Sequence, residues 1–228
     1  MLRILGVPIS VHTRKVIVTA LHKGLPYELV PVVPVIPEQT PPDWHQLSPT
    51  GRIPVLSDGD FHLADSAAIC AYLERLHPQA PLYPAGARDF ARALSLEQYA
   101  GVLFAEVVRP LFHETFVNPG VHGRPTDAAK VHAVLHAAAP PMFAHLDERA
   151  ADGFLVAGAL SIADISVVSN LLTYRYLGFE IDAARYPRLS ALFGRVLSEP
   201  AFQQALRREQ PVVQSMGLRP DAITAALA

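Results

Sequence analysis

The chain has 228 residues, half of them hydrophobic, and its 19 basic side chains nearly balance its 21 acidic ones. This length can build one large domain or two small ones, each with its own core. No block of like charges offers a basic stripe to phosphate, which argues against nucleic-acid binding, and no apolar run reaches the roughly 18 residues of a membrane span. The first residues also lack the pattern of a signal peptide. We therefore expect a soluble, cytoplasmic globular protein with neither a nucleic-acid nor a membrane partner.

The single cysteine, Cys70, excludes a disulfide framework and a Cys-rich zinc site. It falls in the middle of a predicted amphipathic helix, on or beside the apolar face. We expect it to be a small core residue rather than a nucleophile.

The N-terminal stretch predicts a strand, a helix and a second strand in about thirty residues. Residues 2–7 are a short apolar run, residues 13–23 carry apolar side chains at helical spacing, and residues 27–33 return to strand character. Such a βαβ unit places its two strands parallel. Pro31 confines the second strand to a sheet edge because proline cannot donate to a ladder.

Residues 34–50 contain five prolines and predict a loop, with one turn of helix near Trp44. Two short strands follow at 53–56 and 61–63, and Asp58-Gly59 between them is a strong hairpin signal. A helix then opens at Asp65 and Ser66. The resulting order βαβ–ββα predicts a mixed sheet of four strands packed by helices.

Beyond the proline-rich segment 77–88 the sequence predicts only helices. Pro140 and Pro141 should kink or split one of them, and Ser161 with Asp164 has the form of a capping box. We predict an α/β domain over 1–79, a linker over 80–88 and an all-helical domain over 89–228. The predicted helices span 88–116, 126–149, 161–176, 186–198 and 200–209.

The turn from the first strand into the first helix places Ser10, His12 and Thr13 at a helix start. Unpaired N–H groups and the positive end of the helix dipole favour an anion there, such as a thiolate. A hydroxyl at this place can equally be a simple N-cap. The residues leave both interpretations open, with Thr13 the best-placed cap.

Two further turns, at Ile53-Pro54 and at Asp65-Ser66, can also be interpreted either as structural or as ligand-binding. A cis bond at Ile53-Pro54 would turn the backbone so that free N–H and C=O groups face an extended peptide, whereas a trans proline would only begin the strand. The Asp65 carboxylate suits an ammonium group and the Ser66 hydroxyl and amide suit a carboxylate, as in an amino-acid zwitterion. Helix capping by Asp65 is the alternative.

The histidines offer weak grounds for a metal site. His132 and His136 lie four residues apart on a predicted helix, but nothing in the sequence completes a tight set of ligands. We predict no metal.

Taken together, the stretches PISVHTRKVIVTALHKGLPYELVPV, WHQLSPTGRIPVL and LADSAAICAYLERLHP resemble the thioredoxin-like domain of cytosolic glutathione S-transferases, most of all the phi class. SIADISVV resembles the capping box of that family's helical domain. The likeness is dense up to about residue 85 and sparse afterwards. It implies an enzyme that conjugates glutathione to small hydrophobic electrophiles, a homodimer, and no cofactor beyond glutathione as co-substrate.

The resemblance also implies roles for individual residues. Ser10 would donate a hydrogen bond to the glutathione thiolate, Asp65 and Ser66 would hold its γ-glutamyl group, and Gln39 would approach its glycyl end. Arg52 and Ile53 flank Pro54, whose peptide bond to Ile53 we therefore predict to be cis, with the Ile53 backbone pairing to the cysteinyl part. The remaining expected contacts, to glutathione or to the electrophile, are His12, Val11, Phe112, His113 and Phe116.

The sequence departs from the family pattern in three places: Ser48 replaces the usual Asn, Arg52 replaces Gln or Lys, and Asp65 replaces Glu. Neither Tyr nor Cys occupies the first turn, which argues against the Tyr-type and Cys-type classes. Two alternatives stay open: a non-catalytic glutathione-binding or regulatory protein, and a glutathione-dependent peroxidase or isomerase.

Overall fold

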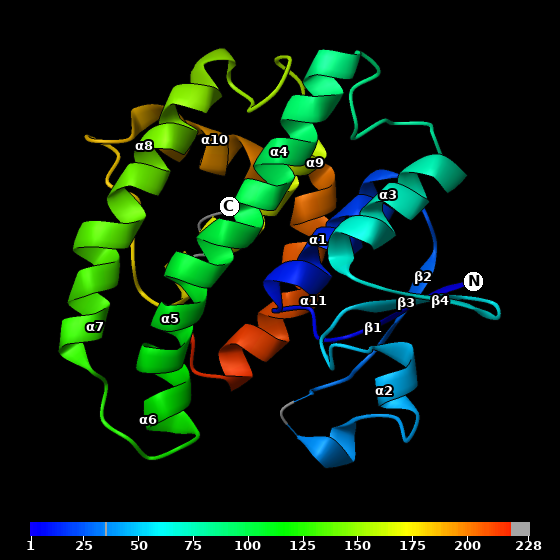
Figure 1. Ribbon diagram of the computed structural model, residues 1–228, viewed down its shortest axis with the longest axis horizontal. Coiled ribbons are helices and arrows are strands. Elements are labelled where there is room, and N and C mark those ends of the chain that lie inside the picture. The colour runs from blue at the N-terminus through cyan, green and yellow to red at the C-terminus, as the bar shows by residue number, and fades with distance from the viewer. Residues whose placement is uncertain (35, 220–228) are drawn as a thin grey trace. The chain divides into compact units, whose positions relative to one another are not determined.

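The computed structural model describes residues 1–34 and 36–219 (Figure 1). Two compact units divide the chain: Met1–Leu82 packs with Glu199–Val212, and Tyr83–Ser198 packs with the described residues from Val213 onward. The first unit holds the sheet and the second is helical, which confirms the predicted fold class. The linker at 80–88 stays a prediction. Residues 199–212 were predicted to belong to the helical domain, but they pack with the first unit.

The first unit is built on a four-stranded mixed sheet in the order β2-β1-β3-β4. Strand β1 pairs in parallel with β2, whereas the pairs β1·β3 and β3·β4 are antiparallel. The edge position predicted for the second strand is confirmed. The strands are β1 (Leu2–Leu5), β2 (Tyr27–Val30), β3 (Val55–Asp58) and β4 (Phe61–Ala64).

Prolines fix two strand boundaries that the sequence pattern placed differently. Strand β2 ends at Val30 rather than at residue 33, because Pro31 has no N–H to continue the ladder. For the same reason β3 begins at Val55, after Pro54, rather than at Ile53. The hairpin turn at Asp58-Gly59 is confirmed, with Gly59 at a φ of 63°.

Helices α1 (Val11–His22) and α3 (Ser66–Leu76) lie together on one face of the sheet, and the short α2 (Trp44–Leu47) lies on the other (Figure 1). A 3-10 turn at Pro37–Gln39 precedes α2. The indole of Trp44 is buried in a cluster with Leu5, Val32 and Val55. This cluster anchors the long loop that leads to Ile53.

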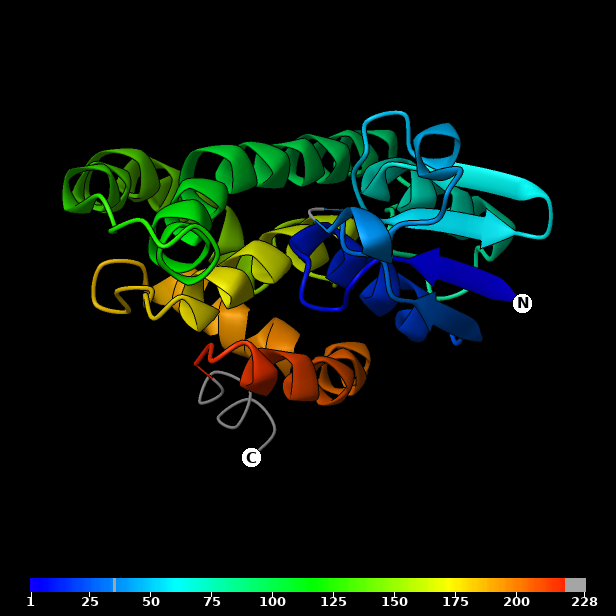
Figure 2. The ribbon, with the colours of Figure 1, turned by 90° about the horizontal axis from the view of Figure 1, so that it is seen from below.

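The second unit is formed mainly by helices (Figure 2). The described part of the chain after residue 82 contains α4 (Ala87–Leu103), α5 (Arg109–Phe112), α6 (Asn118–Gly120), α7 (Ala128–Ala133), α8 (Ala139–Arg149), α9 (Ile162–Tyr176), α10 (Pro187–Leu197) and α11 (Pro200–Ser215).

Three π-helical segments interrupt the two long helices predicted at 88–116 and 126–149. They are Phe104–Val108, His113–Val117 and Val134–Ala138, and each ends two residues before a proline: Pro110, Pro119 and Pro140. Proline lacks the N–H that would pair with the carbonyl four residues earlier, and its ring crowds that carbonyl. The wider π turn relieves this crowding without breaking the helix. The expected break at Pro140-Pro141 is therefore a local widening.

Helix α9 is the buried centre of the second unit, and all its residues except Arg175 are buried. The predicted capping box at its start is confirmed. Helix α11 continues to Ser215 instead of stopping near residue 209, although Pro211 lies inside it. The carbonyl that Pro211 leaves without a donor belongs to the exposed Arg207, so water can pair with it. Within the described residues no helix is long and apolar enough to cross a membrane.

Candidate functional site

Ser10 is the N-cap of α1. Its hydroxyl oxygen accepts a hydrogen bond from the Thr13 amide at 3.5 Å, and its own amide donates to the Val7 carbonyl at 3.1 Å. A hydroxyl that accepts one hydrogen bond keeps its proton to donate elsewhere. Ser10 is half-buried, so an anion can approach that proton at the positive end of the helix. Capping and anion binding are therefore compatible at this residue.

The prediction that Thr13 caps the helix was wrong. Thr13 lies inside α1 and is fully buried, and its Oγ1 has no hydrogen-bond partner among the described residues. It packs so closely on Gly6 that a Cβ at that position would lie 2.6 Å from Oγ1. Ser10, three residues earlier, holds the extended backbone that an N-cap requires, and the helix accordingly begins at Val11.

Arg14 fixes the turn that precedes the helix. Its side chain is fully buried and its Nη2 donates to the Ile9 carbonyl at 3.0 Å. Its Nε donates to Oε2 of Glu209 at 2.8 Å, and Glu209 is also buried. The sequence did not single out this pair, because its two members lie 195 residues apart and no local pattern links them.

The segment from Trp44 to Pro54 is held by its own side chains. The Ser48 hydroxyl donates to the Arg52 carbonyl at 2.7 Å and the Trp44 indole donates to the Gly51 carbonyl at 3.3 Å. Gly51 has a φ of 66°, a conformation that glycine adopts without strain. Ser48, which stands where the family has Asn, is therefore a structural tie within the loop.

The Ile53–Pro54 peptide bond is cis, as predicted. The Ile53 backbone makes no hydrogen bond with another residue in the described ranges. Ile53 is half-buried and the neighbouring Arg52 is exposed. An extended peptide can thus pair with the Ile53 amide and carbonyl.

Asp65 is the N-cap of α3 and Ser66 is its first residue. A single carboxylate oxygen of Asp65, Oδ1, accepts from the amides of Ala67 and Ala68 at 2.9 and 3.1 Å. The second oxygen forms no hydrogen bond to the described part of the chain, and neither does the Ser66 hydroxyl. Capping therefore uses half of the carboxylate and leaves the other half for a cation.

Three of the predicted site residues, His12, Arg52 and Asp65, interact electrostatically. The pKa of His12 is lowered from 6.5 to about 4, chiefly by burial and also by the positive charges of Lys15 and Arg52, while the Asp65 carboxylate acts in the opposite direction. His12 is therefore a neutral imidazole at pH 7. Because Arg52 and Asp65 both affect this pKa, the first-helix turn, the Ile53 loop and the start of α3 lie close enough to interact electrostatically.

The structure gives the positions of the other predicted contact residues, but no interaction between described residues links them to that site. Gln39 is exposed in the 3-10 turn, and Val11 is buried at the start of α1. Phe112 and Phe116 stack with their ring centroids 5.2 Å apart in the second unit, where His113 is exposed. Their contact with an electrophile stays a prediction.

The histidine pairs do not form a metal site within the described residues, which contain no group of three or more potential ligands. His132 and His136 stack on each other with centroids 4.2 Å apart. His145 packs against Tyr99 at 4.8 Å. Cys70 is buried beside the Thr19 hydroxyl at 3.4 Å, as expected of a core residue.

Family models match both parts of the chain. The model "Glutathione S-transferase, N-terminal domain" matches residues 4–81, and "Glutathione S-transferase, C-terminal domain" matches residues 112–208.

Individual proteins agree with this match. A glutathione S-transferase of Triticum aestivum is 31% identical over 210 residues, which cover 90% of this chain and 93% of the wheat protein. A probable maleylacetoacetate isomerase of Vibrio cholerae is 31% identical over 179 residues, covering 76% of this chain and 80% of its own length. The crystal structure of a glutathione S-transferase from Rhodospirillum rubrum superposes with a TM-score of 0.81 at 26% identity, over 90% and 92% of the two chains. This chain therefore belongs to the glutathione S-transferase family of enzymes, which take glutathione as co-substrate.

Proposed function

We propose that this enzyme activates the glutathione thiol with the hydroxyl of Ser10 and conjugates it to small hydrophobic electrophiles. The observation that carries the proposal is the Ser10 hydroxyl itself. It stands half-buried at the N-terminus of α1, accepts from the Thr13 amide and retains a proton to donate.

The chemistry requires a lower thiol pKa. A thiol with a pKa of about 8.5 is only a few per cent ionised at neutral pH, and lowering the pKa by about two units takes roughly 2.7 kcal/mol of differential stabilisation. A hydrogen bond from Ser10 to the anion, together with the helix N-terminus, is of the right size to supply it. The thiolate then forms a C–S bond with the electrophile, and the leaving group departs with the bonding pair.

The other parts of glutathione would bind to protein groups that form no hydrogen bond within the described residues. The Ile53 backbone would pair with the cysteinyl residue, Oδ2 of Asp65 with the γ-glutamyl ammonium group, and Ser66 with its carboxylate. Arg52 would flank this end, and Gln39 would reach the glycyl carboxylate. Because the ammonium and carboxylate groups would each have their own partner, the tripeptide would bind in one direction.

Serine-type chemistry of the phi kind is part of the same proposal, since neither Tyr nor Cys occupies the first turn. Val11, His12 and the aromatic cluster of Phe112, His113 and Phe116 would contact the electrophile. We further infer that the enzyme is a homodimer, and the cytoplasmic location stays a prediction.

The test is Ser10→Ala. If Ser10 donates to the thiolate, kcat/KM at neutral pH should fall about ten- to a hundredfold, equivalent to about 1.4–2.7 kcal/mol of lost anion stabilisation. The bound thiol should titrate at a higher pH, so that activity recovers as the pH rises. The measurement is the ultraviolet absorbance of the thiolate in the glutathione complex, titrated against pH.

His12→Ala and Thr13→Ala are the matched comparisons. Thr13 is buried and points at Gly6, so its replacement should leave the thiol titration in place. An unchanged titration in Ser10→Ala, together with a shifted one in His12→Ala, would assign the activation to His12 and end the serine proposal.

An isomerase activity is a second candidate, favoured by the 31% identity with the probable maleylacetoacetate isomerase. In such a reaction the glutathione thiolate adds to a carbon–carbon double bond and leaves again after rotation, so glutathione is not consumed. Incubation with maleylacetoacetate and catalytic glutathione would reveal it. A chain that is retained on glutathione resin but turns over neither substrate would instead be a binding protein.

A further inference from the structure

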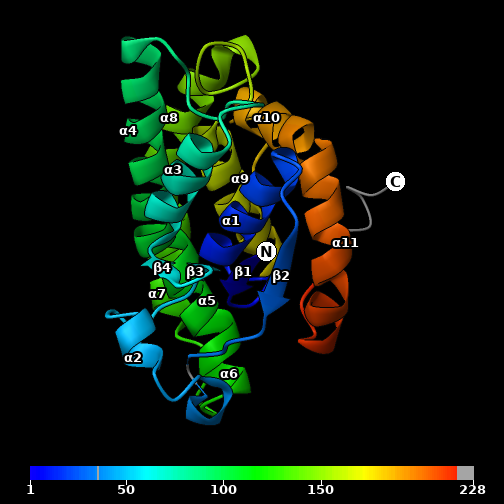
Figure 3. The same cartoon turned by 90° about the vertical axis from the view of Figure 1, so that its right-hand side faces the viewer.

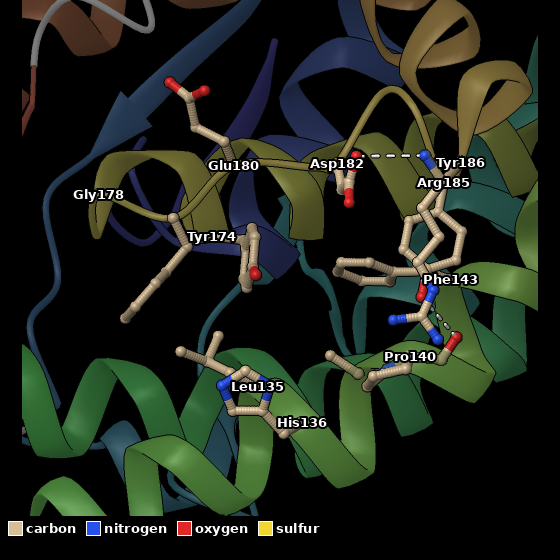
Figure 4. A pocket seen from close by; sticks show the side chains of 12 residues that line it. Leu135, His136, Pro140, Phe143, Tyr174, Gly178, Glu180, Asp182, Arg185 and Tyr186 are labelled. Atoms are coloured by element: carbon tan, nitrogen blue, oxygen red, sulfur yellow. Dashed lines mark hydrogen bonds between the residues drawn. The ribbon is translucent and has the colours of Figure 1, made fainter.

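Arg14 carries a buried charge, in contrast to the arginine at the cavity of the second unit. That cavity, about 460 Å³ in volume, is bordered by the exposed Arg185, and its lining also includes Asp182 and Glu180 (Figure 4). Water and salt screen a charge of this kind, so it constrains its surroundings little. The Arg14 side chain is 0% exposed and that of its partner Glu209 is 1% exposed. Without water to screen it, the Arg14 charge interacts strongly with the groups that it touches.

Arg14 holds the peptide group that immediately precedes Ser10. Its Nη2 donates to the Ile9 carbonyl at 3.0 Å, and the amide at the other end of the same peptide, that of Ser10, donates to the Val7 carbonyl at 3.1 Å. On the far side of Ser10, the Ser10 carbonyl accepts from the Arg14 amide at 2.8 Å. Because peptide groups are planar, these bonds fix both planes that flank Ser10. They thereby fix the direction in which the Ser10 side chain leaves the backbone.

Glu209 sets the orientation of the guanidinium. Its Oε2 accepts from Arg14 Nε at 2.8 Å, while Nη2 of the same planar group reaches the Ile9 carbonyl. A guanidinium is a rigid fork, so holding one nitrogen against a carboxylate fixes the direction of the others. Glu209 lies on α11 and Ser10 caps α1, and both belong to the first unit.

We propose that Arg14 and Glu209 are positioning residues for thiol activation: Glu209 orients Arg14, and Arg14 aims the Ser10 hydroxyl at the glutathione sulfur. This inference rests on the proposed function, because it requires Ser10 to be the donor. A hydrogen bond weakens steeply once its angle falls below about 120°, so a small rotation of the Ser10 peptide weakens donation to the sulfur. The pair acts on the thiol through geometry and touches no substrate.

Two changes separate geometry from charge. The double variant Arg14→Met, Glu209→Leu deletes a positive and a negative charge together, and with them the bond to the Ile9 carbonyl. Arg14→Lys keeps both charges, but the point charge of an ammonium group cannot reproduce the fork. Every variant keeps the charged residues that act on the same turn: Lys15, Arg52 and Asp65.

The measurement is the ultraviolet absorbance of the thiolate in the glutathione complex of the full chain, titrated against pH. In both variants the thiol pKa should rise by about one unit, which lowers kcat/KM for conjugation of 1-chloro-2,4-dinitrobenzene at neutral pH about tenfold. KM for glutathione should change less than about twofold, because the contacts to its γ-glutamyl group are kept. Above the raised pKa, activity should return to that of the unmodified chain.

Two control variants weaken the same helices without reaching the Ser10 turn. Glu74→Gln breaks the ion pair with Lys23, whose side chain is fully buried and which caps the opposite end of α1 at 2.6 Å from the carboxylate. Arg208→Gln removes the contact of α11 with the Tyr27 ring of β2. Both should lose stability in urea unfolding and keep the thiol titration of the unmodified chain.

Ser10→Ala, made alone and together with Arg14→Lys, keeps this inference distinguishable from the proposed function. If Arg14 acts through Ser10, Arg14→Lys should change kcat/KM of Ser10→Ala by less than about twofold. Urea unfolding checks that each variant is folded, and Arg14→Lys carries the test if the double variant is not.

Three outcomes would overturn the inference and leave the proposed function standing, provided that Ser10→Ala itself shifts the titration. They are an unchanged titration in Arg14→Lys, an equal shift in Glu74→Gln or Arg208→Gln, and an additive effect of Arg14→Lys in the Ser10→Ala background. An unchanged titration in Ser10→Ala alone would overturn the proposed function, and this inference with it.

Discussion

Asp65 combines two tasks in one side chain. Its backbone has a φ of 77°, which is unusual for a residue other than glycine, and Oδ1 caps α3. The bend that this φ imposes turns the chain from β4 into the helix, so that Oδ2 remains available beside the start of α3. A positive φ is tolerated better by Asp and Asn than by most residues, because their short polar side chains bond locally. Replacement by Ala would thus disturb the fold as well as the site.

Asp65→Asn separates the two tasks. The amide oxygen can still cap the helix, but the side chain no longer carries the charge that the γ-glutamyl ammonium group would meet. We expect KM for glutathione to rise roughly tenfold, about 1.4 kcal/mol, with little change in kcat, because this contact lies far from the reacting sulfur. Steady-state kinetics over a glutathione series measures it, with the exposed Asp60→Asn as the control. A fall in kcat at constant KM would contradict the assignment.

His12 makes stability depend on pH. Its pKa in the folded protein, about 4, lies below the ordinary 6.5, so the unfolded chain binds this proton more readily. The free energy of unfolding should therefore fall as the pH drops from about 6.5 through 4, by about 2 kcal/mol between pH 7 and pH 5. Urea unfolding at both pH values should show a smaller difference for His12→Asn than for the unmodified chain. The exposed His122→Asn should retain the full difference.

At the scale of the element, the start of α9 depends on one buried carboxylate. Asp164 accepts from the amide and hydroxyl of Ser161 at 2.8 and 2.7 Å, and from the Leu155 amide at 2.8 Å. It thereby joins the preceding loop to the most buried helix of the second unit. Burial raises the pKa of this carboxyl, although each of the three hydrogen bonds acts to lower it.

Asp164→Ala should therefore be strongly destabilising. It leaves three buried donors without an acceptor, and we expect a loss of about 3 kcal/mol in the free energy of unfolding. Urea denaturation followed by circular dichroism measures it. The exposed Asp152→Ala, in the preceding loop, should change the stability by less than about 0.5 kcal/mol. A small effect at Asp164 would mean that the carboxylate is not the support of this helix start.

At the scale of the whole molecule, α11 completes the first unit. Figure 3 shows α11 beside β2 and α1, and Glu209 of this helix pairs with Arg14 of α1. Arg208 adds a hydrogen bond and a cation–π contact to Tyr27 of β2. Through Arg14 and the Ile9 carbonyl, a residue near the end of the chain thus supports the turn that carries Ser10.

Glu209→Gln should cost about 3–5 kcal/mol, because it leaves the buried Arg14 guanidinium without a counter-charge. The double variant Arg14→Met, Glu209→Leu should lose less than the sum of its single variants, since it removes both charges together. Thermal or urea unfolding of the unmodified chain, the two single variants and the double variant gives the four stabilities of this double-mutant cycle. Additive losses would show that the two residues act independently.

The sequence by itself determined the features that neighbouring residues decide. The βαβ–ββα order, the hairpin at Asp58-Gly59 and the capping box at Ser161 all follow from patterns within a few residues, and all are present. The cap at Asp65 belongs to the same class. Local preferences of this kind act on the backbone before any distant contact exists.

Only the tertiary structure decided which hydroxyl caps α1 and what holds the turn before it. Ser10 and Thr13 are both acceptable caps by residue type, and the choice fell to Ser10 because packing on Gly6 buries Thr13. Likewise, Arg14 has a basic side chain that would ordinarily face water, and its burial depends on Glu209, 195 residues away. A buried charge is tolerated only where a partner is brought to it, and the fold of the chain alone determines that meeting.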